Sequence, residues 1–200
     1  GELVRALRAG IPPARIVFAG VGKTDAELAR AIEAEIGHIN LESAGELRRL
    51  ARLAAHARRP VRVAFRITPQ VVGGTHAYTE TGTGVTKFGL PADEALELAR
   101  ALPAGGPVVV AGLHVHFGSQ ILSIGPFVEA ARRAREEVLR FRAAGVPIAT
   151  LNLGGGIGIS YQDEPPLSPA EIAQATAPIV ADLGVTLCFE PARYPLGAAG

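Results

Sequence analysis

Residues 150–158 read TLNLGGGIG, a short β-type run that ends directly in three adjacent glycines. Apolar and β-branched residues bounded in this way predict a buried strand. Adjacent glycines let the main chain approach an anion without interference from a Cβ atom. The segment Gly154–Gly156 is therefore a candidate phosphate loop. A triple glycine alone is a weak signal, and its value depends on the strands around it.

Five further apolar runs recur along the chain, and helical patterns separate them. With the first run, the predicted strands are Ile16–Phe18, His38–Leu41, Val61–Ile67, Pro107–His116, Thr150–Leu153 and Thr186–Glu190. A hydroxyl residue precedes a glutamate by three positions at Thr24, Ser43 and Ser168, which predicts capped helix starts. Alternating strands and helices give parallel pairing with right-handed crossovers, so the predicted class is α/β.

Polar or glycine-rich segments stand at the carboxyl ends of several predicted strands: Asn40–Ser43, Arg66, His114–His116, Gly154–Gly156 and Glu190. One group from each of several strands is typical of a TIM-type (β/α)₈ barrel, whereas a doubly wound sheet gathers its site at one switch point. We therefore expect a barrel. Such barrels have eight strands in about 250 residues. Six strands in 200 residues predict a partial barrel, one domain over residues 1–200 that is truncated at both ends.

Composition excludes several classes of function. The 20 Lys and Arg residues against 19 Asp and Glu give a formal charge of +1, so nothing favours a nucleic acid or an anionic membrane as partner. No run reaches the roughly 18 apolar residues of a spanning helix, and the start lacks a signal peptide. The lone Cys188 fits a reducing compartment. A soluble, cytoplasmic protein is expected.

The segment Gly20–Thr24 suggests a nucleotide phosphate loop, but that motif requires a glycine where this chain has Val17. A strand-to-helix turn capped by Thr24 is the favoured interpretation.

His114 and His116 stand on one face of a strand, spaced as metal ligands can be. No histidine follows them, and the later aspartates Asp163 and Asp182 are poorly placed, so no metal is expected. Two hydrogen-bonded histidines in a polar barrel mouth remain an alternative. The turn after His116, which includes Ser119, offers N–H groups and a hydroxyl suited to phosphate.

Glu190 ends the last predicted strand, and Arg193 follows it closely. A carboxylate at a buried strand end is costly unless it meets a cation. The structural alternative is a simple ion pair between Glu190 and Arg193.

Taken in chain order, these motifs resemble the fold-type III, pyridoxal-phosphate-dependent decarboxylases, the ornithine, diaminopimelate and arginine decarboxylase class with an alanine racemase-like barrel. The resemblance covers essentially the whole chain. The segment from Thr75-His76-x-Tyr78 through Thr81-Gly82 to Lys87-Phe88-Gly89, with the later Gly-Ser-Gln turn, favours the diaminopimelate branch.

The resemblance implies roles for the motif residues toward pyridoxal 5′-phosphate. His116 would stack on the cofactor ring, and Ser119 with Gly154, Gly155 and Gly156 would hold its phosphate. Glu190 would contact the pyridine nitrogen, because a carboxylate there favours the protonated ring that accepts electrons during decarboxylation. His116 and Glu190 are thus the expected catalytic residues.

Arg66 would line the cofactor ring, and Arg193 would bind a substrate carboxylate, for which a planar guanidinium is well shaped. The expected partners are an amino-acid substrate and, in the full-length parent, a second subunit of a homodimer. Ala192 replaces the family's usual glycine and Thr68 its usual asparagine. The lysine that carries the cofactor lies in the family upstream of anything here, and Lys23 and Lys87 match other positions.

By this resemblance the parent enzyme converts meso-diaminopimelate to L-lysine and carbon dioxide, while the isolated chain is expected to be inactive. Two alternatives stay open. One is an ornithine, lysine or arginine decarboxylase of the same fold. The other is a non-catalytic barrel that binds the cofactor or a partner, which Ala192 and the absent lysine would support.

Overall fold

The computed structural model describes residues 1–68, 88–161 and 166–197. The motif between Thr75 and Lys87, which favoured the diaminopimelate branch, lies outside the described residues, as does Asp163.

All the strands are parallel, and helices alternate with them along the chain. The strands are β1 (Val17–Phe18), β2 (His38–Leu41), β3 (Val61–Thr68), β4 (Leu90–Pro91), β5 (Val108–Val115), β6 (Thr150–Asn152) and β7 (Thr186–Cys188). The α-helices are α1 (Glu2–Arg8), α2 (Asp25–Glu33), α3 (Ala44–Ala54), α4 (Ala92–Ala101), α5 (Gly125–Ala143), α6 (Pro169–Val180) and α7 (Arg193–Leu196). Two short 3₁₀ helices are η1 (Pro13–Arg15) and η2 (Ala181–Leu183).

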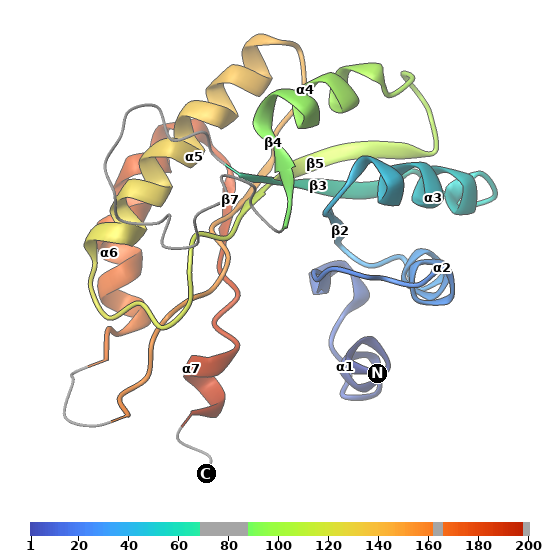
Figure 1. Cartoon of the computed structure of the whole chain (residues 1–200). Helices are drawn as coiled ribbons and strands as arrows, with labels where there is room; N and C mark the ends of the chain where they lie inside the picture. Colours follow the sequence, from blue (N-terminus) through green and yellow to red (C-terminus); the bar gives the residue numbers. More distant parts are fainter. Residues whose placement is uncertain (69–87, 162–165, 198–200) are drawn as a thin grey trace.

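The sheet follows the order β1-β2-β3-β5-β6-β7, so each of these strands lies beside its neighbour in this chain order. Helices α2 to α6 follow one another around the outside of the strands (Figure 1). This arrangement is a half-barrel, which confirms the predicted α/β partial barrel. The six predicted strands are all present.

The additional strand β4 was missed by the sequence analysis. It pairs only with the end of β3, at Ile67 and Thr68. Two residues carry no alternation that a sequence pattern could show, and one of them, Pro91, lacks an N–H group. Strands β6 and β7 also end before the predicted Leu153 and Glu190. The chain still pairs beyond them, since Glu190 N donates to the Gly154 carbonyl at 2.8 Å.

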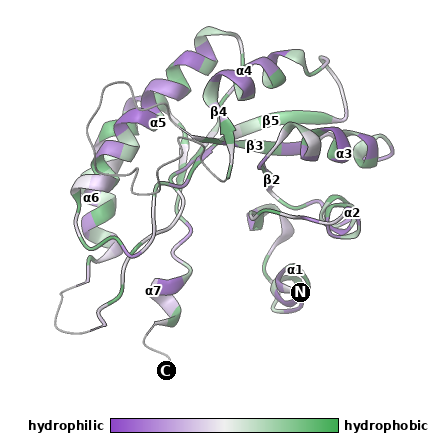
Figure 2. Ribbon diagram, in the orientation of Figure 1, coloured by the Kyte–Doolittle hydropathy of each residue, from purple (hydrophilic) through white to green (hydrophobic). Residues whose placement is uncertain are grey.

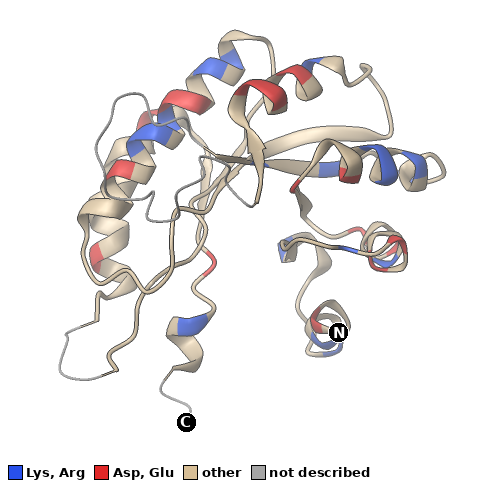
Figure 3. Cartoon of the chain, viewed as in Figure 1, with Lys and Arg blue, Asp and Glu red and all other residues tan. Residues whose placement is uncertain are grey.

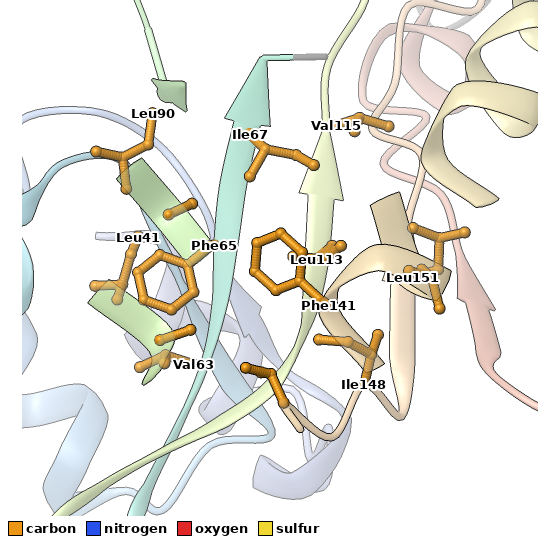
Figure 4. Close-up of a cluster of buried hydrophobic side chains, with 14 of the residues drawn as sticks. Leu41, Val63, Phe65, Ile67, Leu90, Leu113, Val115, Phe141, Ile148 and Leu151 are labelled. Carbon is orange, nitrogen blue, oxygen red and sulfur yellow. The ribbon is translucent and has the colours of Figure 1, made fainter. Parts of the chain in front are cut away.

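The apolar core lies between the strands and the outer helices. Val63, Phe65 and Ile67 of β3 alternate with residues of the opposite face and join Leu113 of β5 beneath Phe141 of α5 (Figure 4). Apolar colouring dominates β3 and β5 (Figure 2), while most of the charged residues are found on the helices (Figure 3). Burying each such side chain contributes about 1.5–3 kcal/mol. The even-numbered residues of β3 are consequently left facing the concave side of the half-barrel.

The predicted helix starts are confirmed at their hydroxyl caps. Thr24 and Ser168 each form a full capping box with the glutamate three residues later. The Ser43 hydroxyl accepts the N–H of Glu46 at 3.1 Å. The predicted reciprocal bond, from the Ser43 N–H to the Glu46 carboxylate, is not formed. The Glu46 carboxylate instead accepts from the Glu42 N–H and from Lys23, because a buried ammonium is the stronger partner. The segment Gly20–Thr24 is thus a capped turn, as expected.

Candidate functional site

Strand register brings polar side chains into one row on the concave face. Arg66 lies opposite His114, His114 opposite Asn152, and Asn152 opposite Cys188. Cross-strand partners project from the same face of a sheet, so these side chains are neighbours near the carboxyl ends of four strands. The preceding row holds Asn40, with small residues beside it. The polar groups predicted at the strand ends are therefore gathered at one mouth.

Glu190 stands at the centre of this mouth. Asn40 Nδ2 and Asn152 Nδ2 both donate to its Oε1, at 3.1 and 2.7 Å. Its Oε2 lies 3.8 Å from His114 Nε2, and the side chain is 30% exposed. The expected partner was a cation, and the partners found are neutral amides. The alternative ion pair with Arg193 is wrong for the residues that the structure describes.

His114 is a buried, neutral histidine. Burial, followed by the charge of Arg66, lowers its pKa to about 3. Asn40 Nδ2 lies 3.0 Å from Nδ1, so Nδ1 is the acceptor and Nε2 carries the proton. His114 is thus one of the hydrogen-bonded mouth histidines of the alternative interpretation, and no cluster of three His, Cys, Asp or Glu residues able to hold a metal occurs in the described ranges.

His116 follows β5 and lies exposed at the rim of the mouth. Gly155 N approaches its Nδ1 at 3.5 Å. Desolvation of the ring, followed by the charge of Arg66, lowers the pKa of His116, while Glu190 opposes the shift. These electrostatic effects show that His116, Arg66 and Glu190 act on one another. A neutral imidazole at the rim is the resulting state near neutral pH.

Arg66 extends from β3 into the mouth. Its Nη1 donates to Glu42 Oε2 at 2.9 Å, and its guanidinium lies over the Phe88 ring at 5.6 Å. Glu42 in turn is held by its own N–H, which donates to Glu46. Arg66 therefore lies in the mouth, and the pair with Glu42 fixes its direction, while its role toward a cofactor stays a prediction.

Lys23 binds the backbone at the carboxyl end of β2. It is almost fully buried and donates to the Gly20 carbonyl at 2.6 Å, the Asn40 carbonyl at 2.7 Å and Glu46 Oε1 at 3.0 Å. All three ammonium protons have acceptors. Lys23 is thus a structural cation that holds the backbone beside Asn40.

The glycines of the loop are needed by the protein's own backbone. A Cβ atom on Gly154, whose φ is +71°, would lie 2.6 Å from the Val115 carbonyl, and one on Gly155 would lie 2.3 Å from the Glu190 carbonyl. The glycines were expected to let an anion approach the backbone. In the structure they first allow the segments after β5, β6 and β7 to pack closely against one another. In the described part of the chain the N–H of Gly156 has no hydrogen-bond partner, so it is free to donate to an anion.

The turn after β5 lies against the segment after β6. Ile121 N donates to the Gly156 carbonyl at 2.8 Å, and Gly158 N returns a bond to Ile121 at 3.0 Å. Ser119, in this turn, is exposed. The structure therefore brings the turn of Ser119 and the glycine loop together.

Gln120 links these two segments with Arg193. Its amide pairs with both the N–H and the carbonyl of Ile159, and its Oε1 accepts from Arg193 Nη1 at 3.1 Å. Arg193 is exposed, so its guanidinium stands at the edge of the mouth. Ala192 has φ −54°, which any residue adopts, so the replacement of glycine causes no backbone strain.

Three polar residues of the mouth had no assigned role: Asn40, His114 and Asn152. Their signal was present, since each stands on the concave face within two residues of a strand end. The contacts among them depend on register across several strands, which no local pattern contains.

A cavity of about 840 Å³ opens elsewhere, nearer the amino ends of the strands, among His38, Arg62, Thr150 and Thr186. It does not include Glu190 or the glycine loop. Within the described ranges, no helix is both long and apolar enough to cross a membrane.

The fold and the site together define a barrel-type α/β protein with a polar ligand site at the carboxyl ends of its strands. The chain belongs to the pyridoxal-dependent decarboxylases, since residues 1–197 match the pyridoxal binding domain of that family.

Relatives include the diaminopimelate decarboxylase of Zymomonas mobilis, 41% identical over 202 residues, which span 100% of this chain and 48% of the relative. The structure of diaminopimelate decarboxylase from Helicobacter pylori, complexed with L-lysine, superposes with a TM-score of 0.84 at 35% identity, covering 96% of this chain and 48% of that one. The arginine decarboxylase of Paramecium bursaria Chlorella virus shares the fold, with a TM-score of 0.73 at 21% identity over 96% of this chain and 50% of that one. The chain thus spans about half the length of the curated relatives it matches.

Proposed function

We propose that this chain forms the cofactor-binding barrel of a diaminopimelate decarboxylase, which releases carbon dioxide from meso-diaminopimelate and leaves L-lysine. The observation that carries the proposal is the Glu190 carboxylate, held by two amides at the mouth with its second oxygen free of them. Identity of 34–41% to diaminopimelate decarboxylases over the whole chain supports the substrate. Ornithine, lysine and arginine remain alternative substrates.

The residues present fit pyridoxal 5′-phosphate. Buried polar atoms without partners, His114 Nε2 and Asn40 Oδ1, adjoin Glu190, so the mouth is built for a polar ligand. We assign the phosphate to the Gly156 N–H, the Ser119 hydroxyl and the neighbouring backbone. When bound, the cofactor supplies a ring that accepts the electron pair left by the departing carboxylate.

Each remaining residue has a role that follows from its charge. Glu190 Oε2 would hold a proton on the ring nitrogen of the bound cofactor, because a carboxylate stabilises the cationic form. A neutral His116 would lie against that cationic ring without charge repulsion. Arg66, neutralised by Glu42, lines the ring, and Arg193 binds a substrate carboxylate.

For the complete protein we also propose a homodimer with a cytoplasmic location, in which residues 1–200 belong to one barrel domain. The resemblance to the family supports the dimer, and the single cysteine supports a reducing compartment.

The phosphate assignment is tested on the chain itself by titration with pyridoxal 5′-phosphate and with pyridoxal. We expect the phosphorylated form to bind at least about tenfold more tightly, equivalent to about 1.4 kcal/mol. Ser119→Ala should reduce this preference, whereas Ser160→Ala, on an exposed residue beyond the loop, should not. Equal binding of the two ligands to the parent chain would contradict the assignment of the phosphate site.

The substrate assignment is tested by carbon dioxide release from meso-diaminopimelate, L-ornithine, L-lysine and L-arginine. The enzyme for this assay comprises the chain with its natural flanking sequence. Preference for any of the last three substrates would replace the diaminopimelate assignment.

A further inference from the structure

We propose that Asn40, Asn152 and His114 are positioning residues for Glu190, which saturate its Oε1 and direct its Oε2 toward the ring nitrogen of the cofactor. The proposal rests on the proposed function for the identity of the ligand. The positioning itself is a property of the chain without ligand, and it comes from three strands, β2, β5 and β6.

The orientation of Asn152 is fixed by two bonds. Its Oδ1 accepts the Gly154 N–H at 2.8 Å, so its Nδ2 must face Glu190, where it donates to Oε1 at 2.7 Å. Asn152 is 1% exposed. The amide therefore couples the carboxylate to the first glycine of the phosphate loop.

Asn40 supplies the second donor to Glu190 and also fixes the tautomer of His114. One of its amide protons points to Glu190 Oε1 at 3.1 Å and the other to His114 Nδ1 at 3.0 Å. The reverse orientation would place the amide oxygen against a carboxylate oxygen, which is repulsive. Lys23 holds the carbonyl of the same residue at 2.7 Å, so the backbone that carries this amide is also fixed.

His114 completes the arrangement through its second nitrogen. Because Nδ1 accepts from Asn40, the proton resides on Nε2, which lies 3.8 Å from Glu190 Oε2 and has no other partner among the described residues. The lowered pKa of His114 agrees with a neutral ring. The His114 Nε2 atom thus lies on the Oε2 side of the carboxylate, 3.8 Å from that oxygen and beyond hydrogen-bond distance.

Neutral donors have a specific advantage here. An arginine against Glu190 would orient the carboxylate but would also neutralise it, and less negative charge would remain for a ring nitrogen. Two amides and a neutral imidazole orient the carboxylate and leave its charge available. This argument also explains why the two cations of the mouth are paired elsewhere, Arg66 with Glu42 and Arg193 with Gln120.

The first test needs no ligand and reads the tautomer of His114 by two-bond nitrogen–proton NMR of the chain. We expect a single Nε2–H form in the parent chain. Asn40→Ala should release an Nδ1–H population, while Asn152→Ala should leave the tautomer unchanged. An Nδ1–H form in the parent chain would overturn the proposal without any variant.

The second test uses pyridoxine 5′-phosphate with an isotopically labelled ring nitrogen, a probe that lacks the aldehyde and needs no lysine. We expect the bound ring nitrogen to stay protonated to a pH at least about one unit higher than in the free probe, a tenfold change in proton affinity. Asn40→Ala and Asn152→Ala should each remove at least half of that shift.

Thr176→Val is the matched control, since Thr176 is also fully buried and its hydroxyl donates to the Ile172 carbonyl within α6, away from Glu190. It should leave the nitrogen shift unchanged. Equal shifts in the parent chain and both asparagine variants would overturn the positioning. Failure of the probe to bind the parent chain would contradict the proposed function, and the tautomer test would still decide the positioning.

Discussion

A Cβ atom on Gly155 would stand 2.3 Å from the carbonyl oxygen of Glu190, a separation at which the backbone must shift. The glycine loop and the backbone of Glu190 are therefore packed against each other directly. The same contact changes what a substitution at Gly155 means. Any side chain at Gly155 acts first on the fold, before it can affect an anion at the loop.

We predict that Gly155→Ala destabilises the chain by about 1–3 kcal/mol, the usual cost of overpacking a close contact. Gly125→Ala, at the start of α5 with nothing within 4 Å of its Cβ position, is the control and should change stability by less than about 1 kcal/mol. Urea denaturation measures both variants. Equal stability of the two would show that the backbone at Gly155 relaxes freely.

Lys23→Met is predicted to cost about 3–5 kcal/mol of unfolding free energy, because it leaves the buried carboxylate of Glu46 without its cation. Asp25→Ala removes the surface pairs with Arg49 and Arg52, which solvent screens, and should cost far less than Lys23→Met. Thermal and chemical denaturation compare the two. A cost for Lys23→Met as small as that of the surface variant would contradict a structural role for the lysine.

Lys23 should also resist covalent modification. An amine must be exposed and unprotonated to react with an aldehyde, whereas all three protons of this ammonium are engaged. Treatment with pyridoxal phosphate, borohydride trapping and peptide mapping should therefore give no stable adduct at Lys23. A pyridoxyl group on this residue in good yield would contradict this prediction.

Acid should weaken the fold through two buried histidines. The pKa of His38 falls to about 4, mainly through burial, and that of His114 to about 3. Below their ordinary pKa of 6.5 the unfolded chain takes up protons that the folded chain does not. The free energy of unfolding therefore decreases as the pH is lowered from about 6.5 to about 4. The decrease is up to about 1.4 kcal/mol per pH unit for each histidine.

His38→Asn isolates half of this effect, because Asn does not titrate and His38 lies away from the Glu190 mouth. Denaturation at pH values from 7 to 4.5 should give a smaller slope for the variant than for the parent chain. An identical slope would mean that His38 is protonated in the folded state.

The sequence predicted most of the scaffold, but not the contacts among the side chains at the mouth. His38–Leu41 has the same bounds as β2, and Thr24 and Ser168 cap their helices, because these signals are local. The partner of Glu190 was expected to be a cation, since burial of a charge favours one. The partners are Asn40 and Asn152, whose proximity to Glu190 depends on the pairing of β2, β3, β5, β6 and β7 together.

The simple strand order has a consequence for how the molecule is assembled. Each strand of the main path is added beside the strand laid down before it, so the sheet can grow in step with synthesis from the amino end. The bond from Asn40 to Glu190 spans 150 residues and closes only when β7 has docked. Ligand recognition at this mouth therefore requires β2 and β7 to be in place together, and a bound ligand would report that the strands between them are in register.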